Sequence, residues 1–193
     1  MFWDGAHFPR LEGHLARLAA SARALGFRHD PSAVARALAV PEGAPLRVRL
    51  TLGPAGDAAV GTAPLPPPPP AGGWRLALAP ARLASTDPLL RHKTTFRPLY
   101  DAARAALPAG IDEMVFLNER GEACEGTITT LFFDLGQGLS TPPLACGCLP
   151  GVLRAELLAA GRCREAVLPA ADLPRARLWM GNALRGLVPS RLA

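Results

Sequence analysis

The sequence is almost without lysine and tyrosine. Lys93 is the only lysine and Tyr100 the only tyrosine, and because Lys and Arg total 21, the other 20 cationic side chains are arginines. Arginine can replace lysine as a surface cation, but not as an amine nucleophile, since guanidinium stays protonated. Lys93 is therefore a candidate for covalent chemistry, and an exposed lysine retained by chance is an equally weighted alternative.

Long apolar stretches and basic clusters are also absent. No apolar run approaches the roughly 20 residues that span a bilayer, and the N-terminus lacks the order of a signal peptide. The net charge of +5 comes from scattered arginines, which argues against nucleic acid as a partner and suits a small anionic substrate or cofactor. We expect a cytoplasmic protein with neither a membrane nor a nucleic-acid partner.

Cysteine is scarce and lacks metal-binding spacing. The four cysteines form no C-x-x-C pair, and the Cys146-Gly-Cys148 spacing is too short for the usual zinc knuckle. No histidine lies near them in sequence. We expect reduced, partly buried thiols and no metal site.

The first part of the chain has the pattern of a small α/β lobe. Apolar residues recur at helical spacing, and alternation marks strands before and after a polyproline loop at 64–73. The predicted helices and strands lie at 11–26, 30–39, 45–52 and 74–80. We place this lobe at residues 1–85.

The rest of the chain predicts a larger, β-rich lobe with helices at 89–193. A proline begins the predicted helix 98–107, and a meander of strands follows at 113–144. A second helix is expected at 150–161, and the chain closes as a strand, a glycine turn and a strand at 177–192.

Four motifs in this second lobe occur in a specific order. They are "HKTTFRPLY" around Lys93, "CEGTITTLFF" with Glu125, "TPPLACGCLPGVLR", and "MGNALRG". Together they resemble the class IV (fold type IV) pyridoxal-phosphate enzymes, which include branched-chain and D-amino-acid aminotransferases and 4-amino-4-deoxychorismate lyase. The resemblance implies a two-lobed α+β fold, pyridoxal 5'-phosphate as the cofactor, and a homodimer.

The resemblance also implies roles for the two central residues. Lys93 would bind the cofactor aldehyde and then act as the base that moves the substrate Cα proton. Its pKa must fall from about 10.4 for this, through burial or a cationic neighbour such as Arg97. Glu125 would accept a hydrogen bond from the ring nitrogen of the cofactor and keep that nitrogen protonated.

Three segments resemble the family's phosphate-binding elements. The helix after Gly151 offers free backbone N–H groups at Val152 and Leu153, and the "GNAL" turn supplies Asn182 and Ala183. In the first lobe, "HLARL" resembles the family's H-x-x-R element, so Arg17 would contact the phosphate. Substrate-pocket candidates of lower rank are Arg97, Tyr100, Thr127 and Arg185.

The sequence departs from the family pattern at three places. Thr130 replaces the usual asparagine, Ala183 replaces the usual serine or threonine, and "MFWDG" stands where members carry a further strand. We expect a lyase similar to 4-amino-4-deoxychorismate lyase, because "LPGVLR" and "GNALRG" are closer to that branch and its substrate is doubly anionic. An aminotransferase for branched-chain or D-amino acids is the alternative, and a truncated, inert cofactor- or phosphate-binding member is another.

Overall fold

The computed structural model describes residues 1–40 and 42–193, and the chain divides into two compact units, Met1–Pro68 and Pro69–Ala193. This division lies earlier than the one expected from the sequence. The strand β4 (Trp74–Leu83) belongs to the second unit, because it pairs in parallel with β5 (Glu113–Asn118) and with β11 (Gly186–Leu192).

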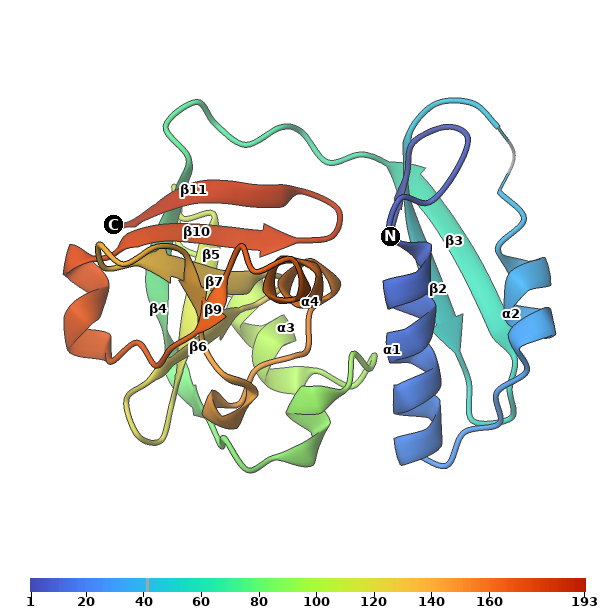
Figure 1. Cartoon of the computed structure of the whole chain (residues 1–193), viewed down its shortest axis with the longest axis horizontal. Helices are drawn as coiled ribbons and strands as arrows, with labels where there is room; N and C mark the ends of the chain where they lie inside the picture. The colour runs from blue at the N-terminus through green and yellow to red at the C-terminus, as the bar shows by residue number, and fades with distance from the viewer. Residues whose placement is uncertain (41) are drawn as a thin grey trace. The chain divides into compact units, whose positions relative to one another are not determined.

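The first unit is an antiparallel sheet with two helices alongside (Figure 1). In β2 the side chains alternate, so that Val48 is buried while Arg47 and Arg49 are exposed. Apolar residues of both helices pack with Val48 in one core, as amphipathic elements require. The elements of this unit are β1 (Phe2–Trp3), α1 (Leu11–Ala24), α2 (Pro31–Ala37), β2 (Leu46–Leu52) and β3 (Ala58–Pro64).

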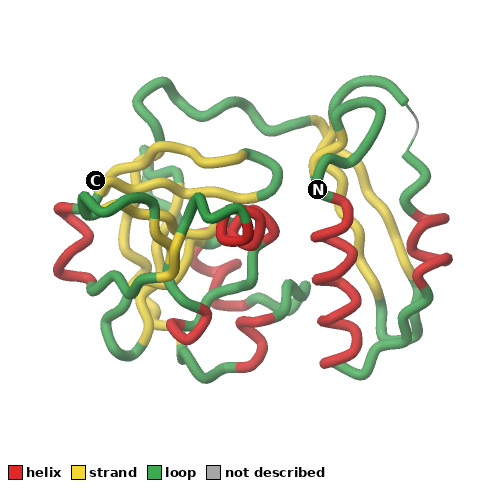
Figure 2. The backbone as a smooth tube through the Cα atoms, in the orientation of Figure 1, coloured by secondary structure: helices red, strands yellow, loops and turns green. Residues whose placement is uncertain are grey.

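The second unit contains one sheet that closes on itself. The strand order is β10-β11-β4-β5-β6-β7-β8-β9, and an additional pairing of β10 with β7 completes a ring of six strands. Figure 2 shows the strands of this unit together with its short helices around them. The remaining strands are β6 (Ala123–Gly126), β7 (Thr130–Asp134), β8 (Ser140–Thr141), β9 (Arg164–Glu165) and β10 (Arg177–Asn182).

Both surfaces of this sheet are covered. One core cluster takes residues from every strand of the ring, among them Val115, Leu131 and Met180, and so fills its interior. Alternate residues of β5 and β6 pack against α3, and those of β7 and β10 pack against α4. The helical elements are η1 (Pro88–Arg91), α3 (Pro98–Ala105), η2 (Leu144–Cys146), α4 (Val152–Ala159) and η3 (Ala170–Arg175).

Candidate active site

Strand register brings two of the sequence motifs into one row. Thr130 on β7 pairs with Glu125 on β6 and, on its other side, with Gly181 on β10. Neighbouring strands are about 4.8 Å apart, so the row extends over roughly 10 Å. The sheet thus assembles the glutamate motif and the "GNAL" turn from segments more than 50 residues apart.

Glu125 is a buried carboxylate held by two donors. The Tyr100 hydroxyl donates to Oε1 at 2.6 Å, and the Leu149 backbone N–H donates to Oε2 at 3.1 Å. Burial raises the pKa of the Glu125 carboxyl, while these hydrogen bonds and the charges of Lys93 and Arg97 oppose the rise. The carboxylate is therefore fixed in orientation, with further lone pairs left for a ligand.

Lys93 lies in irregular chain between η1 and α3, and its positive charge acts on Glu125. The two central residues of the motifs therefore lie within electrostatic reach of each other. Of the two means named for tuning the Lys93 amine, burial is absent because Lys93 is exposed, and a cationic neighbour such as Arg97 stays a prediction.

Arg97 and Tyr100 form a stack beside the carboxylate. The Arg97 guanidinium carbon lies 4.4 Å from the centroid of the Tyr100 ring, which is cation–π geometry. Its Nη2 donates to the Thr127 carbonyl at 2.6 Å. Tyr100 also packs edge-on against Phe116, with 5.0 Å between the ring centroids. Tyr100, ranked low from sequence, thus contacts Glu125 directly.

The start of α4 has no side-chain cap. Gly151 is the N-cap residue and supplies no side-chain cap, and the first N–H groups of a helix have no partner within the helix. Val152 and Leu153, in the first turn, are buried. A Cβ built on Gly151 would lie 2.7 Å from Thr130 Oγ1, so the threonine that replaces the family asparagine borders this helix end.

The "GNAL" turn is ordered by its own asparagine. Asn182 Oδ1 accepts from the backbone N–H groups of Leu184 and Arg185, each at 3.0 Å, and Nδ2 donates to the Ile128 carbonyl at 3.2 Å. Ala183, at the tip, is buried. The Asn182 side chain therefore shapes this turn and ties it to the segment after Glu125.

The same turn lies against α4. A Cβ built on Gly181 would lie 3.1 Å from Leu153 Cδ2, so glycine allows the close approach of the two elements. Arg185 places its guanidinium carbon 5.2 Å from the centroid of the Trp74 ring. The two predicted phosphate-binding segments of this unit are thus neighbours.

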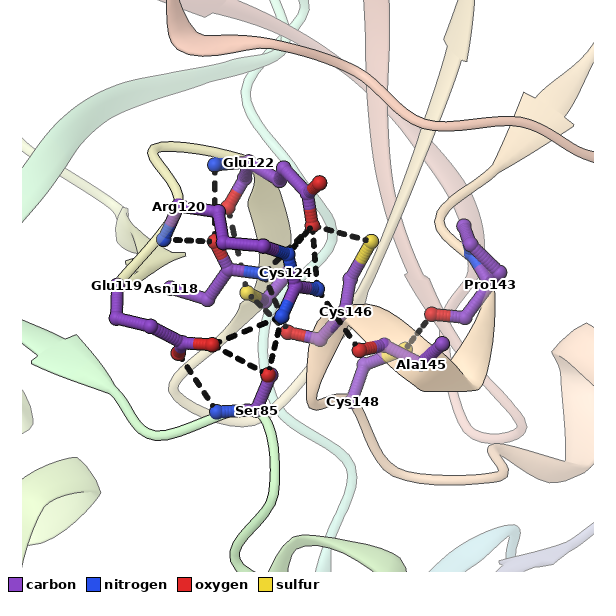
Figure 3. A network of polar contacts seen from close by, with 10 residues as sticks. All are labelled: Ser85, Asn118, Glu119, Arg120, Glu122, Cys124, Pro143, Ala145, Cys146 and Cys148. Atoms are coloured by element: carbon purple, nitrogen blue, oxygen red, sulfur yellow. Dashed lines mark hydrogen bonds and ion pairs between the residues drawn. The ribbon is translucent and has the colours of Figure 1, made fainter.

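A polar network around Arg120 was not predicted from the sequence (Figure 3). Arg120 Nη1 donates to Glu119 Oε1 and Ser85 Oγ, and Nη2 donates to Glu122 Oε2 and the Ala145 carbonyl. It joins the segment after β4, the β5–β6 turn and the η2 segment. Glu113, whose carboxylate contacts the Thr127 backbone, was missed as well, because only the folded chain brings these groups together.

Arg17 lies on α1 in the first unit, and its contact with a cofactor phosphate stays a prediction.

All four cysteines are free and buried. Among residues 1–40 and 42–193, no group of three or more His, Cys, Asp or Glu side chains is placed to hold a metal ion. In the same residues, none of the helices has the length and apolar character of a membrane span.

Residues 1–192 match the family model described as amino-transferase class IV. A Mesorhizobium loti structure, provisionally assigned as an amino-acid aminotransferase, is 47% identical with a TM-score of 0.93, and the match covers 100% of this chain and 97% of that one. A 4-amino-4-deoxychorismate lyase from Pseudomonas aeruginosa is 28% identical with a TM-score of 0.79, covering 100% and 82%.

A branched-chain amino acid aminotransferase from Escherichia coli shares the fold at 22% identity, with a TM-score of 0.76 over 99% of this chain and 75% of that one. No curated protein sequence matches the chain. The expected α+β fold, a small lobe with a larger β-rich lobe, is confirmed by these structures.

Proposed function

We propose a pyridoxal-phosphate-dependent reaction on an amino-acid substrate for this chain, which belongs to the amino-transferase class IV family. The predicted family resemblance is confirmed, and the chain is an enzyme. The family is generally dependent on pyridoxal phosphate. The cofactor, the site residues and the specific reaction are the subject of the proposal.

The donor set of the second unit fits this cofactor. The proposal rests mainly on Glu125, a buried carboxylate that is fixed by two hydrogen bonds and lies within electrostatic reach of the Lys93 charge. The uncapped start of α4 lies beside it through Thr130. An amine, a buried carboxylate and free helix N–H groups are the chemistry that an aldehyde, a ring nitrogen and a phosphate require.

Each residue has a distinct task in the proposed reaction. Pyridoxal phosphate, when bound, supplies an electron sink for the substrate carbanion. The Lys93 amine would hold the cofactor through its aldehyde carbon and, when released by the substrate amine, accept the Cα proton. Glu125 would hold the proton at the ring nitrogen. Tyr100 would keep the Glu125 carboxylate oriented.

The phosphate would be bound by backbone and cationic groups. The N–H groups of Val152 and Leu153 would donate to it at the start of α4, and the Asn182–Ala183 segment would line its other side. Arg17 is the predicted charged fork for the phosphate. Because Ala183 lacks a hydroxyl, the backbone carries more of the binding than in relatives with serine or threonine there.

The first candidate reaction is that of a lyase similar to 4-amino-4-deoxychorismate lyase, which releases pyruvate and leaves 4-aminobenzoate for folate synthesis. The motifs "LPGVLR" and "GNALRG" favour it, and the Pseudomonas aeruginosa lyase aligns with the whole chain at 28% identity. Arg97 and Arg185, beside the site, suit an anionic substrate.

The second candidate is an aminotransferase for branched-chain or D-amino acids. The 47% identity with the Mesorhizobium loti protein favours transfer of an amino group, since that match extends over nearly all of both chains. The two reactions share removal of the Cα proton by Lys93 and differ in the fate of the resulting carbanion. A homodimer and a cytoplasmic location, implied by the resemblance, stay predictions.

Parallel assays test the proposal. Protein incubated with pyridoxal phosphate should become yellow and should then either release pyruvate from aminodeoxychorismate or transfer an amino group from an amino acid to 2-oxoglutarate. Glu125→Gln protein, prepared in the same way, should lose most of the activity because the neutral amide lacks the negative charge that keeps the ring nitrogen protonated. Protein that stays colourless with excess cofactor would contradict the proposal.

A further inference from the structure

Glu113 is a fully buried carboxylate surrounded by donors. It stands at the start of β5 with 0% of its surface exposed. Oε1 accepts from the N–H groups of Met114 and Thr127, each at 3.0 Å, and from Thr127 Oγ1 at 2.5 Å. Oε2 accepts from Thr129 Oγ1 at 2.9 Å and from the Ile128 N–H at 3.3 Å. Four of these five donors belong to the turn 127–129.

The turn 127–129 closes tightly on this carboxylate. A Cβ built on Gly126 would lie 2.6 Å from Thr129 Oγ1 and 2.9 Å from Glu113 Cδ, so only glycine fits between them. Arg104 Nη1 lies 3.7 Å from Glu113 Oε1 and supplies a cation. A buried carboxylate is costly unless its lone pairs are satisfied, and here the turn backbone satisfies them.

The same turn holds the other segments of the candidate site. Its carbonyl at Thr127 accepts from Arg97, which follows Lys93, and its carbonyl at Ile128 accepts from Asn182 of the "GNAL" turn. Glu125 lies two residues before Thr127 on the same chain. A single carboxylate therefore fixes the turn through which the lysine segment, the glutamate strand and the "GNAL" turn are connected.

We propose that Glu113 is a positioning residue for the cofactor: it holds the turn 127–129 so that its carbonyls fix Arg97 and Asn182. This inference rests on the proposed function, because Arg97 and Asn182 matter for catalysis only if the cofactor binds beside them. Glu113 itself faces the turn rather than the ligand. Removing the Glu113 carboxylate should therefore weaken cofactor binding through the Thr127 and Ile128 carbonyls. The effect should be strongest on the cofactor phosphate, because Asn182 orders the "GNAL" turn.

The test compares cofactor affinities of Glu113→Gln protein and the wild type. Dissociation constants for pyridoxal phosphate and for pyridoxal, which lacks the phosphate, are measured by absorbance titration. The amide group of the Glu113→Gln variant would place its own N–H donors next to N–H and O–H donors of the turn 127–129, which would then lose their acceptor. We therefore expect affinity for pyridoxal phosphate to fall about tenfold or more. Affinity for pyridoxal should fall less, so the ratio of the two constants changes.

Two further variants supply a second test and a control. Thr129→Val removes one donor to Glu113 without changing side-chain shape much, and it should shift the ratio of the two dissociation constants in the same direction by a smaller factor. This variant carries the test if Glu113→Gln protein does not fold. Asp134→Asn is the matched control, because Asp134 holds the β7–β8 turn by accepting from the N–H groups of Gly136, Gln137 and Gly138. It should lower stability while leaving both affinities unchanged.

The outcomes separate this inference from the proposed function. Wild-type protein that binds neither compound would overturn the proposed function and this inference with it. If the wild type binds pyridoxal phosphate and both Glu113→Gln and Thr129→Val proteins keep its ratio of affinities, Glu113 has no positioning role and the proposed function stands.

Discussion

Tyr100 and Glu125 show how single residues set the chemistry of the site. The only tyrosine of the chain is buried and donates to a buried carboxylate. Burial raises the pKa of Tyr100, and the charge of Glu125 raises it further, so the hydroxyl keeps its proton and remains a donor. The pair therefore fixes one oxygen of the carboxylate, and the Leu149 N–H holds the other.

Replacing Tyr100 by phenylalanine should destabilise the protein by about 1–3 kcal/mol, because it leaves a buried acceptor without its partner. Urea unfolding measures this change. In a Glu125→Gln background the same substitution should cost less, since an amide needs the hydroxyl less than a carboxylate does. Equal losses in both backgrounds would mean that the Tyr100–Glu125 hydrogen bond contributes nothing specific.

The pH dependence of stability should report the buried Glu125 carboxyl. Its pKa in the folded chain is raised by burial above the ordinary 4.5, so the folded state binds this proton more tightly than the unfolded state does. That contribution is fully present below pH 4.5 and is lost as pH rises through the folded pKa. Glu125→Gln protein should therefore gain stability relative to the wild type as pH increases above 4.5.

Unfolding free energies in urea at several pH values, without cofactor, test this sign. Asp134→Asn is a useful contrast, since backbone N–H groups and Arg177 lower the pKa of Asp134. The stability that the Asp134 carboxylate contributes is present above its ordinary pKa of 3.8 and is lost as pH falls below it, so the difference between Asp134→Asn protein and the wild type should shrink in acid and change little above pH 4.5. A Glu125→Gln difference that shrinks with rising pH would contradict the buried, raised-pKa carboxyl.

At the scale of elements, the site depends on glycines where backbone segments meet. Gly151 begins α4 next to Thr130, and Gly181 lets the "GNAL" turn approach Leu153. Neither contact requires an unusual backbone angle, so space alone demands glycine there. The helix end and the turn can therefore share one ligand.

Gly151→Ala protein should lose about 1–3 kcal/mol of stability, as is typical of overpacking, because the new methyl group meets Thr130 Oγ1 at 2.7 Å. Adding Thr130→Ala should recover part of that loss. Thermal unfolding of the single and double variants measures both effects. Gly61→Ala serves as the control, since nothing lies within 4 Å of its built Cβ, and a loss there as large as at Gly151 would refute the explanation.

At the scale of the second unit, the Arg120 network joins segments that precede the lysine, the glutamate and the helix of the site. The hydrogen bond from Arg120, followed by that from Asn118, lowers the pKa of Glu122 to about 2. Hydrogen bonds from Ser85 lower the pKa of Glu119 to about 2. Both carboxyls therefore favour the folded state when they are ionised.

Arg120→Met protein should lose stability at neutral pH and show less of a difference from the wild type in acid. A lowered pKa contributes stability above the ordinary 4.5, and that contribution is lost as pH falls toward about 2. Urea unfolding at pH 7 and pH 3 measures the change. A difference from the wild type that is as large at pH 3 as at pH 7 would exclude the ion-pair network as its cause.

Much of this architecture could be predicted from local patterns. The helices that start at Pro98 and near Gly151, and the motifs around Lys93, Glu125 and Asn182, are fixed by residues adjacent in sequence. The strand β3 was missed, because its small residues and Gly61 give little alternation. Burial, one of the two means named for tuning the Lys93 amine, is absent, because Lys93 is exposed.

Contacts between residues that are far apart in the sequence could not be predicted in the same way. From the sequence alone, Glu113 is an ordinary charged residue at the start of a strand and Arg120 is a turn residue. Their hydrogen-bond partners become apparent only when strand register and closure of the ring bring distant segments together. The pairing of β10 with β7, which closes the ring and aligns Gly181 with Thr130, is likewise a property of the whole unit. Sequence motifs therefore name the candidate site residues, whereas the contacts of Glu113 and Arg120 become visible only in the folded chain.

The central claim is that Lys93 binds the cofactor covalently, and borohydride reduction of protein loaded with pyridoxal phosphate tests it most directly. Because Lys93 is the only lysine, peptide mass analysis can distinguish it from the N-terminal amine, the other primary amine of the chain. We predict one reduced cofactor on the peptide that contains Lys93, and none in Lys93→Arg protein treated identically. Label on the N-terminal peptide alone, or equal label in the Lys93→Arg protein, would contradict the account.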